Sequence, residues 1–257
     1  GRNSPSKHNY TSNQRFFGSD SRGEFTKVSA VFSLKGKKAL ITGAGSSSGI
    51  GFASASALKQ LGAEVIITST TKRILDRAKE IQARGLVADL CDEREVQELF
   101  SSIDSLDILV NNAGMTSVSK PAGDSEAGDV ASIELSNWRL GMARNLESAF
   151  LVTKYALPLL RESKSGRIIM ISSVTGALMA MRNQPIYASA KAGMIGLTKS
   201  LALDEAKYSI TCNAILPGWI ATDSISDKEK EQGRFVPLGR GGRAEEVASA
   251  VAFLVSE

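Results

Sequence analysis

The stretch KALITGAGSSSGIG (38–51) decides the fold class, because an apolar run leads directly into a turn of glycines and serines. Its first part, KALIT (38–42), does not alternate with polar residues, which is typical of a strand covered on both faces. A helical pattern begins at Ile50, so the turn precedes a helix N-terminus, where free N–H groups bind phosphate. Since glycines let a phosphate approach the backbone, the stretch predicts a dinucleotide-binding turn.

Five further apolar runs follow along the chain, each flanked by a helical pattern. Continuous apolar runs indicate parallel strands with right-handed crossovers. The sequence therefore predicts an α/β fold with a doubly wound parallel sheet of the Rossmann type, in three layers α/β/α. We expect one dinucleotide-binding catalytic domain over residues 33–257, with the second helix reaching about Arg84. The five runs are EVIIT (64–68), LVAD (86–89), LDILVN (106–111), RIIMIS (167–172) and ITCNAI (210–215).

Residues 1–32 differ from the rest, because they are rich in Ser, Asn, Gly and Arg and have no apolar period. Such a segment is expected to be disordered. It is either a linker or an organelle-targeting presequence, since residues 1–19 contain no acidic side chain and include RFFGS (15–19). Two surface segments are also expected, TSVSKPAGDSEAGDVASI (116–133) as a loop and residues 224–242 over the substrate cleft.

Composition excludes several classes of protein. The net charge of the 257 residues is +4, of which +3 lies in residues 1–30, so a nucleic-acid surface is not indicated. No run approaches ~18 apolar residues, so no membrane span is expected. The two cysteines, Cys91 and Cys212, are far apart, as in a reducing compartment. The single histidine, His8, lies in the tail, which argues against a Ser-His-Asp hydrolase or a metal site. We expect a soluble protein of the cytoplasm or the mitochondrial matrix.

The end of the second strand bears on the choice of nicotinamide dinucleotide. A carboxylate there would bind the ribose hydroxyls and repel a 2′-phosphate. The stretch ITSTTKR (67–73) contains no carboxylate and ends in Lys72 and Arg73. This pattern favours NADP(H). The alternative is that both cations face solvent at the start of a helix.

The pentapeptide YASAK (187–191) places a tyrosine and a lysine one helical turn apart. Residues at i and i+4 share a helix face, so Tyr187 and Lys191 can reach one site. An ammonium near a phenol is expected to lower the pKa of the phenol. A shift from ~10 to ~7 requires about 4 kcal/mol and would make Tyr187 an efficient acid or base. The alternative is an ordinary helix whose small residues pack against a neighbour.

Taken in order, the motifs between residues 34 and 257 resemble the short-chain dehydrogenase/reductase family. TGAGSSSGIG (42–51) is similar to the family's glycine motif, with two extra residues in the turn. Further matches are NNAG (111–114), ARNLESAF (143–150), ISSVTG (171–176), YASAK and PGWIATD (217–223). The residues that the resemblance and the turn chemistry assign to the cofactor are Gly43, Gly45, Ser46, Ser47, Ser48, Gly49, Ile50, Gly51, Ser69, Thr70, Lys72, Arg73, Asp89, Leu90, Asn112, Ala113, Gly114, Tyr187, Lys191, Pro217, Gly218, Ile220 and Thr222.

The resemblance also implies a mechanism and four catalytic residues. NADPH would give a hydride to a carbonyl carbon, and Tyr187 would protonate the developing alkoxide. Ser173 would donate a hydrogen bond to the carbonyl oxygen. Lys191 would bind the nicotinamide ribose, and Asn145 would support a water that returns a proton to the tyrosine.

Within the family, the chain is most similar to the β-ketoacyl-acyl-carrier-protein reductase group. The likeness lies in GRIIMISSVTG (166–176), YASAKAGMIGLTKSLALD (187–204) and the segment before PLGR (237–240). It implies a β-ketoacyl thioester of acyl carrier protein or CoA as substrate, a role in fatty acid biosynthesis, and a homodimer or homotetramer joined through the YASAK helix. Small ketones, sugars or steroids remain alternative substrates. An enoyl reductase, in which the tyrosine and lysine are spaced more widely, and a non-catalytic NADPH sensor remain alternative functions.

The chain ends in AVAFLVSE (250–257), whereas members of the family usually continue into a seventh strand. We therefore expect the usual seventh strand to be missing and the domain to be C-terminally incomplete. One edge of the sheet would then be open.

Overall fold

A computed structural model describes residues 31–114, 127–223, 231 and 233–257. Within it, Phe32–Glu257 forms one compact unit. The expectations for residues 1–30 lie outside the described residues, as do most of those for the loop at 116–133 and for residues 224–230.

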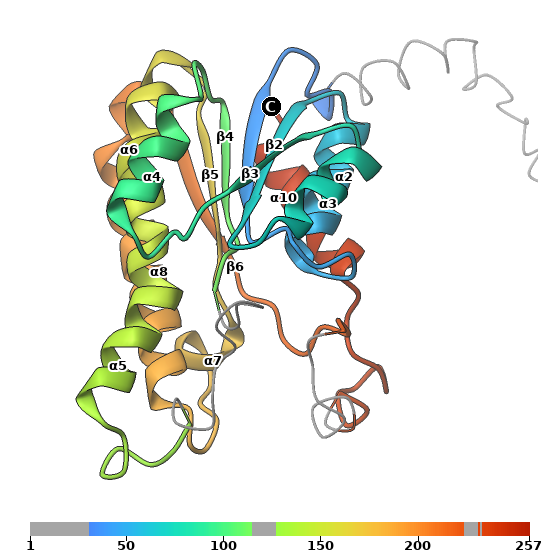
Figure 1. The fold of residues 1–257 in the computed structure, drawn as a ribbon. Helices are drawn as coiled ribbons and strands as arrows, with labels where there is room; N and C mark the ends of the chain where they lie inside the picture. The colour runs from blue at the N-terminus through green and yellow to red at the C-terminus, as the bar shows by residue number, and fades with distance from the viewer. Residues whose placement is uncertain (1–30, 115–126, 224–230, 232) are drawn as a thin grey trace, which may run out of the picture. The chain divides into compact units, whose positions relative to one another are not determined.

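The centre of this unit is a six-stranded sheet in which every pair of neighbouring strands is parallel. The strand order is β3-β2-β1-β4-β5-β6, so the chain reverses direction across the sheet between β1 and β4 (Figure 1). This order confirms the predicted doubly wound Rossmann-type fold. The strands are β1 (Lys38–Thr42), β2 (Glu64–Ser69), β3 (Arg84–Val87), β4 (Ile108–Asn111), β5 (Arg167–Ile171) and β6 (Thr211–Ile215).

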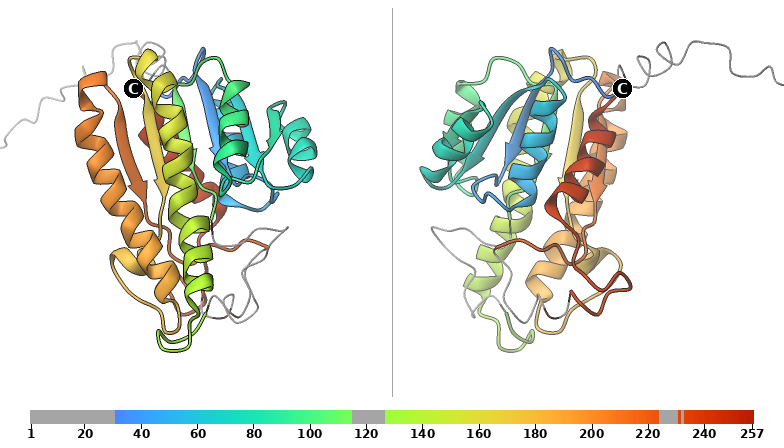
Figure 2. Two further views of the ribbon diagram at one scale, coloured as in Figure 1. Left: turned by 60° about the vertical axis from the view of Figure 1, so that its left-hand side comes forward. Right: turned by 90° about the vertical axis from the view of Figure 1, so that its right-hand side faces the viewer.

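Helices cover both faces of the sheet, which gives the predicted three layers (Figures 1 and 2). One face carries α2 (Ile50–Gln60), α3 (Arg73–Glu80) and α10 (Ala244–Val255). The opposite face carries α4 (Glu93–Ser101), α6 (Ser148–Glu162) and α8 (Pro185–Asp204). The remaining elements are α5 (Leu135–Met142), a π-helical turn η2 (Ala143–Glu147), the short α7 (Val174–Ala177) and the 3-10 turn η3 (Ala206–Tyr208).

The second helix and third strand differ from the prediction, since α3 ends at Glu80 and β3 begins at Arg84. The reason is a helix-ending turn. Gln82 adopts a left-handed conformation with φ 53°, and the N–H of Ala83 donates back to the carbonyl of Ala78 at 2.8 Å. This turn ends α3 earlier than predicted. As a result, β3 begins two residues before the predicted strand LVAD (86–89).

Alternate residues of each central strand enter the two core layers. Leu40, Leu109 and Ile168 pack under α4, α6 and α8, while the residues that follow them, Ile41, Val110 and Ile169, pack under α2 and α10. Both sets are fully buried. A strand that is apolar on both faces reads as a continuous apolar run, which explains the pattern in the sequence.

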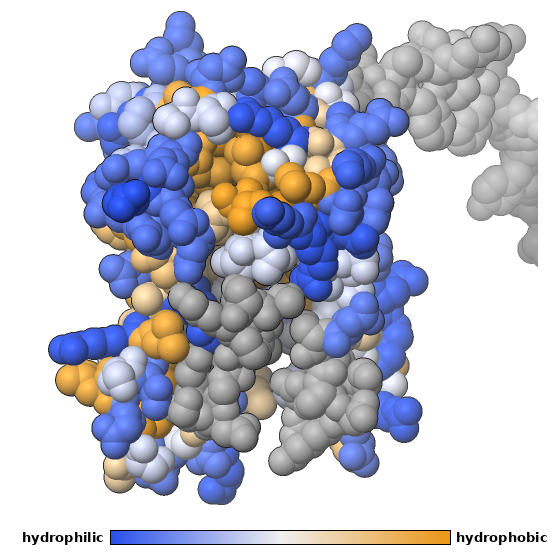
Figure 3. Space-filling view, in the orientation of Figure 1, coloured by the Kyte–Doolittle hydropathy of each residue, from blue (hydrophilic) through white to orange (hydrophobic). Residues whose placement is uncertain are grey.

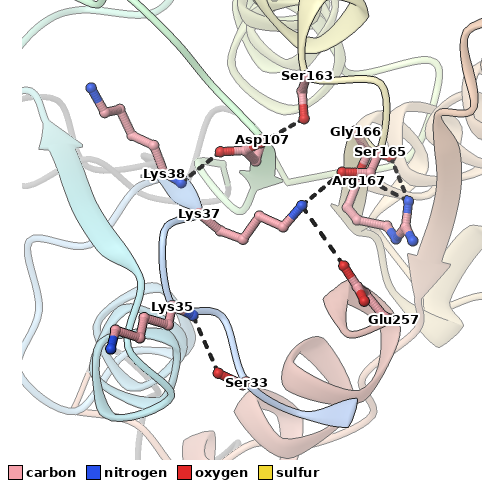
Figure 4. A network of polar contacts seen from close by, with 10 residues as sticks. All are labelled: Ser33, Lys35, Lys37, Lys38, Asp107, Ser163, Ser165, Gly166, Arg167 and Glu257. Atoms are coloured by element: carbon pink, nitrogen blue, oxygen red, sulfur yellow. Dashed lines mark hydrogen bonds and ion pairs between the residues drawn. The ribbon is translucent and has the colours of Figure 1, made fainter. Parts of the chain in front are cut away.

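The amino and carboxyl ends of the strands have different roles. At the amino ends of the strands, polar contacts join β1 to the segments that lead into β4 and β5 (Figure 4). The Asp107 carboxylate accepts from Lys38 N at 2.8 Å and from Ser163 Oγ at 2.5 Å, and Lys37 Nζ donates to Ser165 Oγ at 2.8 Å. The glycine turn and the catalytic motifs follow the carboxyl ends, where doubly wound sheets bind ligands.

A groove of about 610 Å³ lies beside α4 and the edge strand β3. It is lined by apolar Leu86, Val87 and Leu99 and by charged side chains of α4, and apolar side chains gather in this region of the surface (Figure 3). None of the predicted site residues lines it. No helix among the described ranges has the length and apolar character needed to cross a lipid bilayer.

Candidate active site

The glycine turn is held against the carboxyl end of β4 by the amide of Asn112. Asn112 Nδ2 donates to the carbonyls of Thr42 and Gly43 at 3.0 and 3.1 Å. A Cβ on Gly51 would lie 2.5 Å from Asn112 Nδ2, so only glycine lets α2 begin this close. Asn112, predicted to bind cofactor, therefore also fixes the shape of the turn.

The hydroxyl of Thr42 joins the same two strand ends. It accepts the backbone N–H groups of Asn112 and Ala113, both at 3.0 Å, and donates to the carbonyl of Val110 at 3.3 Å. Thr42 was not among the predicted site residues. Its position as a polar residue at the end of a buried apolar strand was the signal that could have identified its role in joining the strand ends.

The serines of the turn differ in exposure. Ser46 to Gly49 form a β-turn closed by a hydrogen bond from Gly49 N to the Ser46 carbonyl at 3.2 Å. Ser47 is exposed, while Ser46 and Ser48 are half-buried with their hydroxyls 3.4 Å apart. Ile50 and Gly51 then begin α2.

Arg73 lies beside the glycine turn. A Cβ on Gly45 would lie 3.0 Å from Ser69 Oγ and 3.4 Å from a guanidinium nitrogen of Arg73. Lys72 and Arg73 are exposed at the start of α3, next to Ser69 and Thr70. No carboxylate among the described residues forms an ion pair with either cation. The positive charge of Arg73 therefore lies beside the turn, together with the positive end of α2.

Asp89 and Leu90 follow β3. One carboxylate oxygen of Asp89 accepts the N–H of Cys91 at 3.0 Å, and the N–H of Asp89 donates to Glu95 Oε2 at 2.7 Å. The side chain of Leu90 is buried in the core, so only its backbone remains to border a cofactor.

Ser173 and Tyr187, the serine and tyrosine predicted to be catalytic, meet at the carboxyl end of β5. Ser173 is buried and caps α7, where its Oγ accepts the N–H of Thr175 at 3.1 Å. Gly176, with φ 94°, allows this loop to lie against the carbonyl of Ala188, the residue after Tyr187. Burial raises the pKa of Tyr187, and a hydrogen bond with Ser173 lowers it in part.

Lys191 is buried on the inner face of α8, where its Nζ donates to the carbonyl of Ile171 at 2.9 Å. The Nζ lies 5.7 Å from the centre of the Tyr187 ring, so the two side chains share a site as predicted. Burial lowers the pKa of Lys191 to about 8. The same helix is anchored to β5 by Ser172 Oγ, which donates to the Lys191 carbonyl at 2.8 Å.

The predicted downward shift of the tyrosine pKa is wrong, because the pKa of Tyr187 is raised. The prediction considered only the attraction between the Lys191 ammonium and the Tyr187 phenolate. In the structure both groups are removed from water, and desolvation disfavours the charged form of each one. Tyr187 therefore retains its proton at neutral pH, which suits a proton donor.

Asn145 lies within the π-helical turn η2, where its Nδ2 donates to the carbonyl of Gly141 at 3.0 Å. Such π-helical turns are common at functional sites. A Cβ on Gly114 would lie 3.0 Å from Asn145 Oδ1 and 3.6 Å from Lys191 Nζ. The absence of a side chain at Gly114 thus leaves space between these two polar groups.

The segment after β6 lies against the loop that carries Ser173. Pro217 accepts the N–H of Val174 at 3.1 Å, and Gly218 is exposed with open space around its Cα. Ile220 pairs with Gly242. Thr222 is half-buried at the end of this segment.

A family model described as Enoyl-(Acyl carrier protein) reductase matches residues 43–257. The chain belongs to the short-chain dehydrogenase/reductase family. Among curated relatives, it is 39% identical over 244 residues to the 3-oxoacyl-[acyl-carrier-protein] reductase of Aquifex aeolicus, covering 87% of this chain and 92% of that protein. It is 36% identical over 236 residues to the corresponding Rickettsia felis protein, covering 88% and 92%.

A solved structure described as an NAD(P)-dependent gluconate 5-dehydrogenase from Beutenbergia cavernae, with bound NADP at low occupancy, superposes with a TM-score of 0.78. It is 30% identical and covers 88% of this chain and 92% of that one. The matches confirm the predicted enzyme class, a 3-oxoacyl-acyl-carrier-protein-reductase-like oxidoreductase with a nicotinamide cofactor.

The residues present fit the nicotinamide dinucleotide of a short-chain dehydrogenase/reductase. The turn from Gly43 to Gly51 would hold the pyrophosphate, and the buried amine of Lys191 faces the space left by Gly114. No group of three or more His, Cys, Asp or Glu residues suited to a metal ion occurs within the described part of the chain.

Proposed function

We propose that this enzyme is an NADPH-dependent reductase that converts the ketone of a β-ketoacyl thioester, carried by acyl carrier protein or CoA, into an alcohol. The observation that carries the proposal is the convergence of Ser173, Tyr187 and Lys191 at the carboxyl end of β5. The likeness to 3-oxoacyl-[acyl-carrier-protein] reductases supports the substrate class and a place in fatty acid biosynthesis. The unit Phe32–Glu257 is proposed to be a single catalytic domain.

The proposed mechanism assigns each step to a residue of this chain. The cofactor supplies the hydride when bound. Ser173 donates a hydrogen bond to the ketone oxygen and stabilises the charge that develops there. Tyr187, which keeps its proton because of burial, transfers that proton to the oxygen. Lys191 lies close enough to favour the resulting phenolate, and Asn145 lies beside Lys191 to support a proton-returning water.

The preference for NADPH is supported by Arg73. Its guanidinium lies near Gly45 and Ser69 and has no carboxylate partner among the described residues, so it is free to bind a 2′-phosphate. Arg73→Ala should lower kcat/KM for NADPH by about 10-fold or more and leave that for NADH within about twofold. Lys79→Ala, on the exposed face of the same helix, is the control. A wild-type preference for NADH would refute the NADPH proposal.

The substrate proposal is tested with a panel of β-ketoacyl thioesters, simple ketones and enoyl thioesters. We expect the β-ketoacyl thioesters to have the highest kcat/KM. Tyr187→Phe should bind NADPH normally but lose at least about 100-fold in reduction. Wild-type turnover in this variant would refute the proton-donor role. Binding of NADPH without oxidation by any substrate would instead favour a sensor.

The description of the matching family model makes enoyl reduction the second candidate. The spacing of Tyr187 and Lys191 favours ketone reduction over enoyl reduction. The two residues are four apart on α8, whereas an enoyl reductase is expected to space them more widely. Preferred oxidation of NADPH by enoyl thioesters in the same panel would reverse this order.

We also propose that the enzyme forms a homodimer or homotetramer through the outer face of α8. The small residues of this helix divide between two faces, since Ala190 is buried against the sheet while Ala192 and Gly196 are exposed. Beside them an apolar cleft of about 410 Å³ is lined by residues that include Leu146, Phe150 and Gly193. Sedimentation of the wild type and of Phe150→Glu tests the proposal, since the charge should dissociate the assembly.

A further inference from the structure

A hydrogen bond joins two segments that are far apart in the sequence and that both belong to the cofactor site. The backbone N–H of Asp223 donates to Ser48 Oγ at 2.9 Å. Ser48 is the third residue of the β-turn from Ser46 to Gly49, and the hydroxyls of Ser46 and Ser48 lie 3.4 Å apart. The tip of the phosphate turn is therefore attached to the segment that follows β6.

The segment Pro217–Asp223 is also held at its start and in its middle. At its start, Pro217 accepts the N–H of Val174, the residue after the catalytic serine. In its middle, Gly242 donates to the Trp219 carbonyl at 2.8 Å and accepts from Ala221 N at 2.7 Å. The Ser48 bond adds an attachment at the end of the segment, on the side of the glycine turn. The segment thus connects the catalytic loop with the phosphate turn.

We propose that Ser48 is a positioning residue that holds the nicotinamide-binding segment in place before the cofactor arrives, so that the phosphate turn and this segment act as one unit. The inference rests on the proposed function, because the role of Ile220 and Thr222 toward the nicotinamide is part of it. It gives Ser48 an effect on cofactor affinity that acts through its bond to Asp223.

The physical reason is preorganisation. Without the Ser48 bond, the end of the segment would explore more conformations, and the cofactor would have to order it on binding. An exposed hydrogen bond of this kind corresponds to about a 3–10-fold change in affinity. Once the cofactor is bound, its own contacts order the segment. The effect should therefore fall on cofactor affinity and leave kcat at saturating cofactor within about twofold.

The chain offers a matched set of variants. Ser48→Ala removes the hydroxyl that accepts from Asp223, whereas Ser48→Thr keeps it and should restore wild-type behaviour. Ser47→Ala removes a hydroxyl from the same turn, where the side chain is exposed and takes no part in this link.

The first measurement uses the whole chain without cofactor. Amide hydrogen exchange is followed on the peptide that contains Pro217–Asp223. We expect exchange to be about 3–10-fold faster in Ser48→Ala and unchanged in Ser47→Ala and Ser48→Thr. Equal exchange in Ser48→Ala and Ser47→Ala would overturn the inference, and so would acceleration spread evenly over the chain.

The second measurement is titration of each variant with NADPH, followed by the fluorescence of the reduced nicotinamide. Ser48→Ala should raise Kd by about 3–10-fold, with Ser48→Thr near wild type. The control for this titration is Ser105→Ala, since Ser105 is exposed and lies outside the predicted cofactor site. An unchanged Kd in Ser48→Ala would overturn the coupling. If the wild type reduced no ketone at all, the proposed substrate would be refuted, while exchange and titration would still decide the role of Ser48.

Discussion

Replacement of Lys191 by methionine should stabilise the protein at neutral pH while removing its activity. Lys191 is buried on α8, and its amine donates to the carbonyl of Ile171. Burial lowers its pKa from 10.5 to about 8, so at pH 7 the folded state carries an ammonium that would be more stable in water. Methionine has a similar shape and no charge to desolvate.

The magnitude follows from proton linkage. Between pH 8 and 10.5 the unfolded chain binds a proton at Lys191 that the folded chain has released, so the stability of the wild type rises with pH through this window. The shift corresponds to about 3 kcal/mol, which destabilises the wild type below pH 8 and is regained above pH 10.5. Loss of the bond to Ile171 costs the variant about 1 kcal/mol at either pH. Lys191→Met should therefore be about 2 kcal/mol more stable at pH 7 and close to the wild type at pH 10.

The assay is urea unfolding at pH 7 and pH 10, at one fixed protein concentration because the proposed assembly would contribute to stability. Lys199→Met is the control, since Lys199 is exposed on the same helix and its ammonium stays in water in both states. The decisive quantity is the change in the stability difference between wild type and variant from pH 7 to pH 10, expected to be about 2–3 kcal/mol. A difference that does not depend on pH would refute the argument from burial.

Two further predictions concern stability. Thr42→Val should destabilise the fold by about 1–2 kcal/mol, because two half-buried N–H groups lose their acceptor. Its neighbour across β1 and β2, Thr68, has a buried hydroxyl with no hydrogen-bond partner in the described structure, so Thr68→Val should be neutral or stabilising in the same urea titration. Equal losses in both would contradict this. Arg161→Met should cost about 2–3 kcal/mol, since it leaves the buried Glu205 carboxylate without its two bonds at 2.6 and 2.7 Å. Arg161 lowers the pKa of Glu205, so this contribution is present above the usual carboxyl pKa and should vanish as acid protonates Glu205. A loss that persisted unchanged in acid would show that the ion pair is not its source.

Local patterns predicted the sheet and the proximity of Tyr187 and Lys191. Six apolar runs identified six parallel strands, because a strand covered on both faces has no polar side to show. The four-residue step from Tyr187 to Lys191 predicted that they share a site, because helical geometry alone places them on one face. The ends of helices were not predicted correctly where a single backbone conformation decides them. Gln82 is the example, because its left-handed conformation ends α3 early.

The protonation of the site was decided by packing. The sequence predicted a lowered pKa for Tyr187 from the proximity of a cation, yet the tertiary structure buries both groups and raises it. Proximity along a helix is a property of the sequence, whereas desolvation depends on everything that covers the helix.

The links that shape the cofactor site were also invisible in the sequence. Thr42 meets Asn112, and Ser48 meets Asp223, across 70 and 175 residues. Neither pair has a periodicity or spacing that a local pattern could carry. The sequence therefore determined which elements form and which residues are candidates for the chemistry. Only folding decided which polar groups meet and how strongly burial acts on their charges, because both depend on contacts between segments that the sequence keeps apart.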